Sequence, residues 1–492
     1  MTLKYKANKV YVLYFVLAFI ICLSLNFGIL KDYIFLDANE YLYTATRNSN
    51  FHHEFIQGGR PLLGFWCEYL YGYVCNTISD LKWVRLFALS VSVLFSSQIF
   101  RYLLKLNLKI YESALFSILI LTLPTFTVYY GWSATAEIPV LLILNFYAGQ
   151  LLLKALTKTK NRILHFFFAF TIIFTSLFIY QSVVMVFLLP IVFIGVIKNE
   201  FKIRIWLQIL LFTLICFLAY FISFKIMLNY TDLEATTRSS LSIIDLPKKV
   251  IKFHLIEVIT LIKGSGFLVA SIVSFIIGLF AFSGFFIKQY IKNKSILSSL
   301  IISLIIAFSY APNILSGQSY FSLRTIAPTA IIVLFYQFYF FRELSIKNTL
   351  FKKTILIIPI ILLAYSSHNL NNYIAEVQNK EYKTAKTVFL KVDINKTNQI
   401  TFIRPEYGFL QKNEVLKNGF SGEFGNLSSV KDWALPNLFS QVVWENSTST
   451  DKTEEIFSPK NILVTTEENY IPSENNTTVI NFVTIFKGAF KN

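Results

Sequence analysis

The sequence predicts a polytopic α-helical membrane protein with about eleven spans and a small C-terminal α/β domain. Three observations predict this class. Hydrophobic residues make up 55% of the chain and charged residues only 15%, which is typical of a protein dissolved mainly in lipid. Apolar runs long enough to cross a bilayer core of roughly 30 Å recur up to about residue 370. Lysine and arginine gather on alternate connections between these runs, as the positive-inside rule requires.

The first apolar run, 10–30, is too long for a cleavable signal peptide, and no small-residue cleavage site follows it. We therefore expect it to remain as a helix. A looser apolar run, PLLGFWCEYLYGYV from Pro61, carries Glu68 and several tyrosines and is interpreted as an interfacial or re-entrant part of the first outer loop. The other predicted spans lie near 84–103, 113–129, 138–153, 163–180, 183–197, 205–228, 265–287, 296–311, 325–341 and 354–370.

The charge distribution predicts the orientation. Each inner segment carries three or four basic residues, and together the inner segments contain only three acids, Glu112, Glu200 and Glu343. This bias predicts an N-terminus inside and, with an odd number of spans, a C-terminus outside; if the run from Pro61 spanned the membrane, every later orientation would be reversed. The net charge of +17 therefore comes mostly from the basic residues of the inner segments, which set the orientation in the membrane. No nucleic-acid partner is expected. The segments assigned to the inner side are 1–9, 101–112, 154–162, 198–204, 288–294 and 342–353.

The composition changes near residue 371. The remainder, 371–492, has nearly balanced acidic and basic residues, a helical stretch at its start and strand-like runs such as QITFIRP and NILVTTEE. This pattern predicts a soluble α/β domain that lies at the outer membrane face. Residues 1–370 then form a transmembrane domain, whose main outer loops are 31–83 and 229–264.

Acidic residues follow the first span directly, in the segment KDYIFLDANEYLYTATR. Asp37 and Glu40 are three residues apart, so a helix that starts there places both carboxylates on one face, where one can act as a general base. The alternative is a capping box, in which both side chains bind backbone N–H groups. Asp32 is the weaker candidate because it lies beside Lys31 at the end of the span. The next acidic candidate is Glu137 in YYGWSATAEIP, since an acid at the mouth of a span is costly unless it is used or paired.

Isolated basic groups lie at the predicted outer boundary. Arg60 in QGGRPLLGF and Arg324 in SYFSLRTIAP suit a phosphate, whose oxygens match the planar guanidinium. The alternative for such an arginine is to reach toward lipid headgroups. Arg238 lies in the loop 229–264, which could cover a lipid-phosphate substrate. Gln181 in the hairpin between the fifth and sixth spans is a weaker binding candidate, and Tyr41 is an aromatic candidate for stacking on a sugar ring, as are Tyr43 and Trp132.

No metal site or disulfide is expected. His52, His53 and Glu54 could be imagined as ligands, but a solvated loop whose adjacent histidines point apart is favoured. Cys67 and Cys75 share the first outer loop, yet on one helix they would lie about 12 Å apart, too far for a disulfide. No Cys/His spacing is typical of zinc. A divalent metal is possible in the reaction but is not required.

The acids of the first outer loop, the boundary arginines and the C-terminal domain together resemble the GT-C superfamily of integral-membrane glycosyltransferases. The stretch GFSGEFGNLSSVKDWALPN (419–437), with LDANEY and GGRPL, resembles the serotype-converting O-antigen glucosyltransferases. This resemblance implies that undecaprenyl-phosphate glucose is the donor and that the O-antigen of a Gram-negative bacterium is the acceptor, on the periplasmic face of the inner membrane. It implies that other proteins make and flip the donor, that Asp37 or Glu40 is the base, and that Glu423 and Trp433 help to engage the glycan.

The expected reaction is a single displacement that inverts the anomeric carbon. The base accepts the proton of the acceptor hydroxyl, while Arg60 or Arg324 neutralises the departing phosphate. Alternatives are a transferase that decorates lipid A, a cell-wall polymer or protein, a lipid-linked oligosaccharide flippase, and a noncatalytic assembly or sensor protein. A flippase should concentrate ionisable groups near the midplane of its spans, whereas most charges here lie at span ends.

Overall fold

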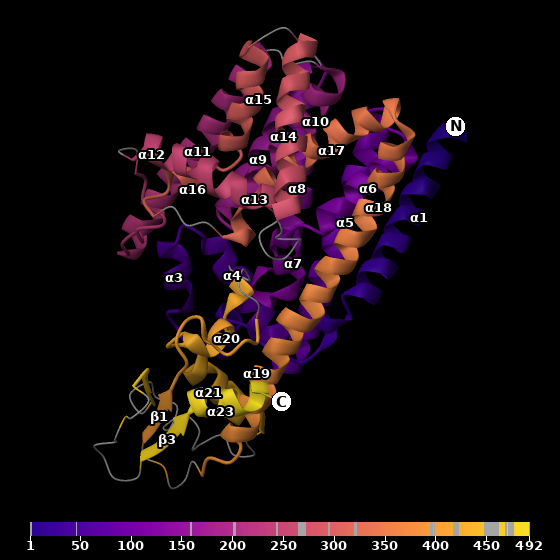
Figure 1. Cartoon of the computed structure of the whole chain (residues 1–492). Helices are drawn as coiled ribbons and strands as arrows, with labels where there is room; N and C mark the ends of the chain where they lie inside the picture. Colours follow the sequence, from indigo (N-terminus) through magenta and orange to yellow (C-terminus); the bar gives the residue numbers. More distant parts are fainter. Residues whose placement is uncertain are drawn as a thin grey trace.

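The structure is a computed structural model of the chain, and it is described over the parts whose placement is defined. A bundle of long helices occupies one end of the molecule, and a smaller α/β unit lies at the other end, beyond the short helices α3 (Phe51–Gln57) and α4 (Pro61–Tyr69) (Figure 1). The described residues are 2–45, 47–157, 160–199, 203–242, 245–263, 272–293, 296–318, 322–393, 397, 399–416, 423–446, 462–467, 470 and 477–491.

Within these ranges, six helices are long and apolar enough to cross a membrane, so the chain is a helical membrane protein. They comprise Ile78–Lys105, Ser133–Thr157, Gln181–Lys198, Ile203–Thr231, Phe275–Lys292 and Ala327–Ile346. A seventh span results if α6 (Ile110–Leu121) and α7 (Pro124–Gly131) are counted together, although their axes differ by 59°. The bend falls where Pro124 starts α7, since proline offers no N–H to continue α6 and forces the preceding Leu123 into an extended conformation.

Three other predicted spans are helical but shorter. Among the described residues, the apolar parts of α1 (Thr2–Leu25), α9 (Arg162–Leu177) and α15 (Ile296–Phe308) contain between 10 and 17 residues. The predicted first span, 10–30, ends as an α-helix at Leu25 and continues as the 3-10 helix η1 (Phe27–Leu30). The last predicted span coincides with α18 (Thr349–Asn369), which contains Pro359. A total of eleven spans therefore stays a prediction.

Short helices fill the connection between α1 and α5 (Leu81–Lys105). They are α2 (Asp37–Thr44), α3 (Phe51–Gln57), α4 (Pro61–Tyr69), the π-helix η2 (Leu70–Val74) and the 3-10 helix η3 (Ile78–Asp80). At 1.5 Å per residue, the nine residues of α4 and the five of η2 are too short to cross roughly 30 Å of hydrocarbon. The run from Pro61 therefore lies at one end of the bundle.

The rest of the bundle alternates long helices with short breaks. These elements are the 3-10 helix η4 (Ser133–Thr135), α8 (Ile138–Thr157), η5 (Gln181–Leu188), α10 (Leu189–Lys198), α11 (Ile203–Thr231), α12 (Leu246–Lys252), η6 (Phe253–Val258), α13 (Ile259–Lys263), α14 (Ile272–Asn293), α16 (Ala311–Leu315), η7 (Leu323–Thr325), α17 (Ala327–Lys347) and η8 (Leu370–Ala375). The breaks at η5, α16 and η7 matter for the site, because they bring polar backbone and side chains to the helix ends around one cavity.

The α/β unit, 376–491, contains a three-stranded parallel sheet in the order β2-β1-β3. The central strand β1 (Gln399–Ile403) is mostly buried and pairs with β2 (Ile462–Thr465) and β3 (Thr477–Asn481). Parallel strands need crossover connections, and Phe389, Phe402, Phe439 and Phe482 from helices and strand form the aromatic core between them. The helices are α19 (Glu376–Phe389), α20 (Phe409–Lys412), α21 (Ala434–Asn446) and α23 (Phe482–Lys491), with the 3-10 turns η10 (Glu423–Gly425) and η11 (Ser428–Val430).

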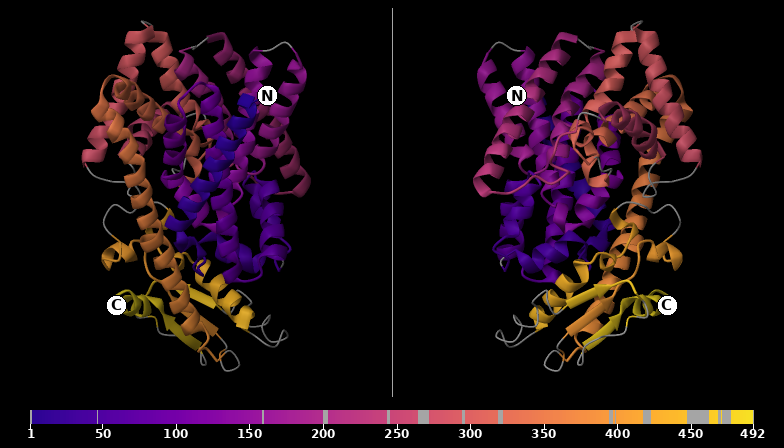
Figure 2. Two further views of the ribbon diagram at one scale, coloured as in Figure 1. Left: turned by 90° about the vertical axis from the view of Figure 1, so that its right-hand side faces the viewer. Right: turned by 90° about the vertical axis from the view of Figure 1, so that its left-hand side faces the viewer.

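The α/β unit packs directly on the connection between α1 and α5, as the two views in Figure 2 show. Residues Ile78 and Asn76 bond to side chains of α21: the Ile78 N–H donates to Glu445 (2.8 Å), and Gln441 donates to the Asn76 carbonyl (3.0 Å). From α19, Asn379 donates to the carbonyl of Asp32 (2.6 Å). The position of the early acidic segment therefore depends on residues more than 300 positions later.

Candidate functional site

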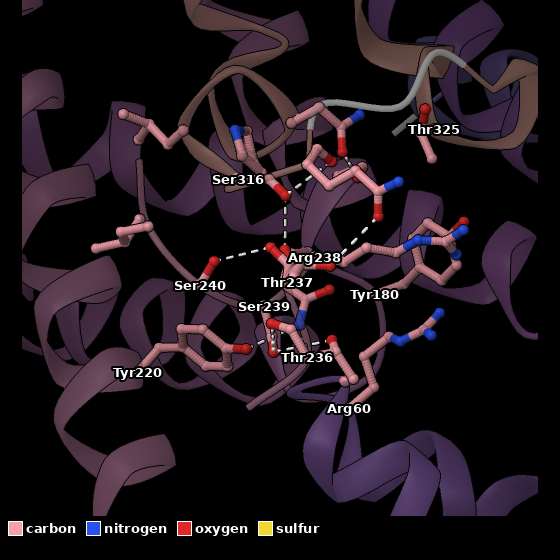
Figure 3. A pocket seen from close by; sticks show the side chains of 18 of the residues that line it. Arg60, Tyr180, Tyr220, Thr236, Thr237, Arg238, Ser239, Ser240, Ser316 and Thr325 are labelled. Carbon is pink, nitrogen blue, oxygen red and sulfur yellow. Dashed lines mark hydrogen bonds between the residues drawn. The ribbon is translucent and has the colours of Figure 1, made fainter. Parts of the chain in front are cut away.

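A cavity of about 510 Å³ opens where α3, η5, α11, α16 and η7 meet. Its lining brings together four of the residues predicted to bind substrate: Arg60, Gln181, Arg238 and Arg324. Most of the other lining side chains carry hydroxyl or amide groups (Figure 3). The polar lining residues are Glu54, Gln57, Arg60, Tyr180, Gln181, Ser182, Tyr220, Thr236, Thr237, Arg238, Ser239, Ser240, Asn313, Ser316, Gln318, Arg324 and Thr325.

Arg60 enters the cavity from a turn built by two glycines. Gly59 has a φ of +70°, and its carbonyl accepts hydrogen bonds from Gln181 Nε2 (2.8 Å) and Tyr220 Oη (2.9 Å). These bonds tie the turn to η5 and α11. Arg60 then precedes Pro61 at the start of α4, with its guanidinium 5.8 Å from the ring centre of Tyr180. The turn therefore directs a cationic group into the cavity.

Arg324 lies in η7 and is fixed from several sides. Its Nη1 donates to Oδ2 of Asp37 at 3.4 Å, and its guanidinium lies 4.7 Å from the ring centre of Trp132. Trp132 is buried, and its indole N–H donates to the Phe35 carbonyl (2.9 Å). Its ring is thus occupied by Arg324 and is not exposed for a sugar. Tyr129 donates to the Arg324 carbonyl (2.9 Å).

Asp37 begins α2, but it does not cap the helix. The residue that precedes α2 is Leu36, which adopts φ 43° and ψ −120°, and no side chain forms a cap bond there. The capping-box interpretation of Asp37 and Glu40 is therefore wrong, because the turn at Leu36 places Asp37 inside the helix with its carboxylate toward Arg324. A leucine in this region of backbone space costs about 1–3 kcal/mol. Such strain persists only where surrounding contacts hold it.

Glu40 lies near two other acids. Burial, the Glu54 carboxylate and the Asp37 carboxylate together raise the pKa of Glu40 to about 7. Glu54 is the one acid among the described residues that line the cavity, and it was not predicted as a site residue. It lies in the helix α3 rather than in the predicted solvated loop, and His52 on the same helix bonds to Glu68 (2.8 Å).

Glu137 lies at the start of the span Ser133–Thr157 and is 5% exposed. One of its carboxylate oxygens, Oε1, has no hydrogen-bond partner within the described part of the chain. Arg60 and Arg324 are both close enough to act on its charge. Two of the three arginines of the cavity, Arg60 and Arg324, therefore lie near the acids Asp37 and Glu137, although neither acid lines the cavity itself.

The segment 236–240, TTRSS, forms the outer wall and is tied down at both ends. Ser239 Oγ donates to the Gln57 carbonyl (2.6 Å), and Ser316 Oγ donates to the Arg238 carbonyl (2.6 Å). Thr236 and Ser239 also exchange a hydroxyl bond (Figure 3). Arg238 is exposed at this rim. The hydroxyl residues of TTRSS were not predicted as site residues, although four hydroxyl side chains next to one arginine are a pattern that could have indicated a binding site.

The remaining predicted residues lie away from the cavity. Tyr41 packs among the rings of Phe51, Phe55 and Tyr71, and burial raises its pKa. In the α/β unit, Glu423 begins η10, and Trp433 is 38% exposed. Neither Tyr41 nor Trp433 lines the cavity.

The described residues contain no cluster of three or more histidine, cysteine, aspartate or glutamate side chains arranged to hold a metal ion. Cys67 and Cys75 are both buried and free. The polar groups that line the cavity are a carboxylate, guanidinium groups, hydroxyls and amides.

Comparison of the sequence with protein-family models and with curated proteins finds no match. The resemblance to the GT-C glycosyltransferases accordingly stays a prediction, and a function is proposed from the geometry of the cavity.

Proposed function

We propose that the protein is a glycosyltransferase. It moves a glucosyl or other hexosyl group from an undecaprenyl-phosphate-linked donor to O-antigen on the periplasmic face of a bacterial inner membrane. The observation that carries this proposal is the Asp37–Arg324 pair beside a cavity that also contains Arg60 and Arg238. Such a transfer requires a carboxylate that accepts a proton and a cation that binds phosphate, and this pair supplies one of each.

The arginines suit the phosphate of the donor. Guanidinium groups form strong, directional bonds to phosphate oxygens, and Arg60 has no ion pair within the described residues. When the sugar–phosphate bond breaks, the phosphate leaves with the bonding electrons, and the adjacent arginines neutralise its added charge. The lipid tail would extend sideways along the apolar bundle.

The acids suit proton removal. As the acceptor oxygen attacks the anomeric carbon, its proton passes to a carboxylate, and the single displacement inverts that carbon. Asp37 is the first candidate because it touches Arg324, and donor phosphate that competes for Arg324 would release its carboxylate. Glu40 and the buried Glu137 are the further candidates.

The hydroxyl-rich wall suits the hexose. The side chains of Thr236, Ser239 and Gln181 offer donors and acceptors of the kind that hold sugar hydroxyls. A cavity of about 510 Å³ lies within the size range of small-ligand sites. The α/β unit is proposed as the platform for the longer glycan acceptor, with Glu423 and exposed Trp433 on it.

The test is transfer by the purified full chain in proteoliposomes, with lipid-linked sugar and acceptor on the same side. Asp37→Asn should reduce transfer at least about a hundredfold, as expected for loss of a general base, and Glu40→Gln tests the alternative base. Asp32→Asn is the matched control, because Asp32 bonds to Ser79 (3.1 Å) outside the cavity. Wild-type transfer in both Asp37→Asn and Glu40→Gln would contradict the proposal, as would transbilayer movement of the donor without transfer.

A further inference from the structure

The turn that leads into α2 is held by the α/β unit. The backbone N–H of Leu36 donates to Ser428 Oγ at 3.0 Å, across 392 positions of sequence. Leu36 is the residue with φ 43°, and Asp37 follows it directly. One hydroxyl of the α/β unit therefore fixes the peptide plane next to Asp37, the acid that contacts Arg324 of the cavity.

Ser428 is itself fixed by a buried carboxylate. Glu381 of α19 is 2% exposed, and its two oxygens accept the backbone N–H groups of Ser428 (3.0 Å) and Ser429 (2.8 Å). No ion pair of Glu381 occurs within the described ranges. A buried carboxylate without a cation is costly, and it is retained only where its hydrogen bonds matter. Here those bonds hold η11 rigidly against α19.

We propose that Ser428 and Glu381 are positioning residues for Asp37: Glu381 fixes η11, and Ser428 of η11 fixes the turn at Leu36. This inference rests on the proposed function. It gives the α/β unit a second task besides any contact with a glycan, because the unit completes the site of transfer through the backbone.

The geometry distinguishes this role from simple support of the α/β unit. The core of that unit is formed by Phe389, Phe402, Phe439 and Phe482. The Ser428 hydroxyl instead accepts from Leu36 in another part of the chain at 3.0 Å, and its bond to Gln378 within the unit is the longer one, at 3.5 Å. Asp37 reaches Arg324 over 3.4 Å, near the outer limit of a charge-assisted bond. A small shift of the turn would therefore change the contact, and misplacement of a reacting group by about 1 Å can cost about a hundredfold in rate.

The experiment compares Ser428→Ala, Ser428→Thr and Thr401→Val in the purified full chain. Ser428→Thr retains a hydroxyl. Thr401 of β1 is the matched control, since it is a fully buried hydroxyl of the same unit with no hydrogen-bond partner among the described residues. Hydrogen exchange of the peptide containing Leu36 is measured first, because it reports on the contact whether or not transfer occurs.

In Ser428→Ala, exchange of the Leu36 amide should become about tenfold faster, while exchange in β1 stays unchanged. In the transfer assay, kcat should fall about tenfold or more, while KM for the donor stays within about twofold, because the cavity lining does not include Ser428. Ser428→Thr should restore most of kcat and most of the protection of the Leu36 amide from exchange. Thr401→Val should resemble the wild type.

Unchanged exchange at Leu36 in Ser428→Ala would overturn the inference. Faster exchange with wild-type kcat would overturn it as well, because the contact would then be structural only. Absence of transfer in the wild type would count against the proposed function, whereas the exchange measurement would still decide whether Ser428 holds the turn.

Discussion

Arg324 donates to Asp37 over 3.4 Å, although 287 positions separate the two residues in the sequence. The side chains are only 19% and 28% exposed, so solvent screens this pair less than a surface pair. The acid and the cation of the proposed site therefore neutralise each other. A phosphate that binds Arg324 must compete with Asp37.

The first prediction follows from this competition. Asp37→Asn should bind undecaprenyl phosphate about tenfold more tightly than the wild type, because the arginine loses its competing carboxylate, while transfer is lost. Arg324→Gln should bind it about tenfold more weakly. The measurement is binding of undecaprenyl phosphate to the purified protein in detergent. Asp32→Asn serves as the control and should bind like the wild type; equal affinity in Asp37→Asn and wild type would refute the competition.

The three arginines that line the cavity were predictable from the membrane topology. Hydropathy places the ends of spans at the membrane boundary, so Arg60, Arg324 and Gln181 were expected on one face, and the structure brings them into one cavity. The interaction of Asp37 was not predictable. An acid followed by glutamate three residues later has the same spacing whether it caps a helix or lies inside it, and the outcome depends on the turn at Leu36 and on Ser428.

Hydropathy was also less decisive where helices are short or broken. The predicted span 113–129 is two helices, since Pro124 interrupts it. Glu54 was missed because the helix α3 contains only seven residues and has no repeated pattern. Its role at the cavity depends on packing against elements far along the chain, which a single sequence does not reveal.

The second prediction concerns pH and Glu40. The folded state raises the pKa of this carboxyl from 4.5 to about 7 through burial and the charges of Glu54 and Asp37. Between these values the folded chain holds a proton that the unfolded chain releases, so stability falls as pH rises through this window. Glu40→Gln should therefore be more stable than wild type at pH 8, by roughly 1–2 kcal/mol after allowance for solvent screening, with little difference at pH 4.5.

The measurement is thermal unfolding of both proteins in detergent at several pH values. Glu68→Gln is a suitable comparison, because Glu68 pairs with His52 rather than with another acid. The difference in Tm between Glu40→Gln and wild type should grow from pH 4.5 to pH 8. A constant difference would show that the fold does not raise the pKa of Glu40.

The third prediction compares alanine substitutions at two adjacent glycines, Gly58 and Gly59. A methyl group on Gly59 would lie 2.3 Å from Tyr220 Oη, and its φ of +70° disfavours other residues. Gly59→Ala should therefore displace Arg60 and reduce transfer about tenfold or more. Gly58→Ala is the matched control, since its methyl group would meet only the Glu54 carbonyl at 3.1 Å and the side chain of Arg60 at 3.5 Å.

Transfer and donor binding should be measured for both alanine variants at equal protein amounts in the membrane. Gly58→Ala should keep most of its activity because small shifts relieve its contacts. If the two variants lost activity equally, the bonds of the Gly59 carbonyl to Gln181 and Tyr220 would not be what positions Arg60.

The fourth prediction concerns Arg85, a fully buried arginine of α5. Its guanidinium donates to the carbonyls of Ile29 (2.8 Å), Lys31 (2.6 Å) and Tyr33 (2.9 Å), and it stacks on the Tyr33 ring at 3.7 Å. These three bonds fix the chain between the first helix and Leu36. They use the planar fork of the guanidinium, which an ammonium group cannot reproduce.

Arg85→Lys should therefore leave buried carbonyls unpaired and destabilise the protein by about 2–4 kcal/mol, seen as a lower Tm in detergent. Arg101→Lys provides the control, because Arg101 lies on the same helix with an exposed side chain and should change Tm little. Since the segment held by Arg85 leads into α2, the residual folded protein should also show faster hydrogen exchange at 29–36. If Arg85→Lys kept the Tm and the hydrogen exchange of the wild type, the α/β unit alone would hold the segment 29–36 in place.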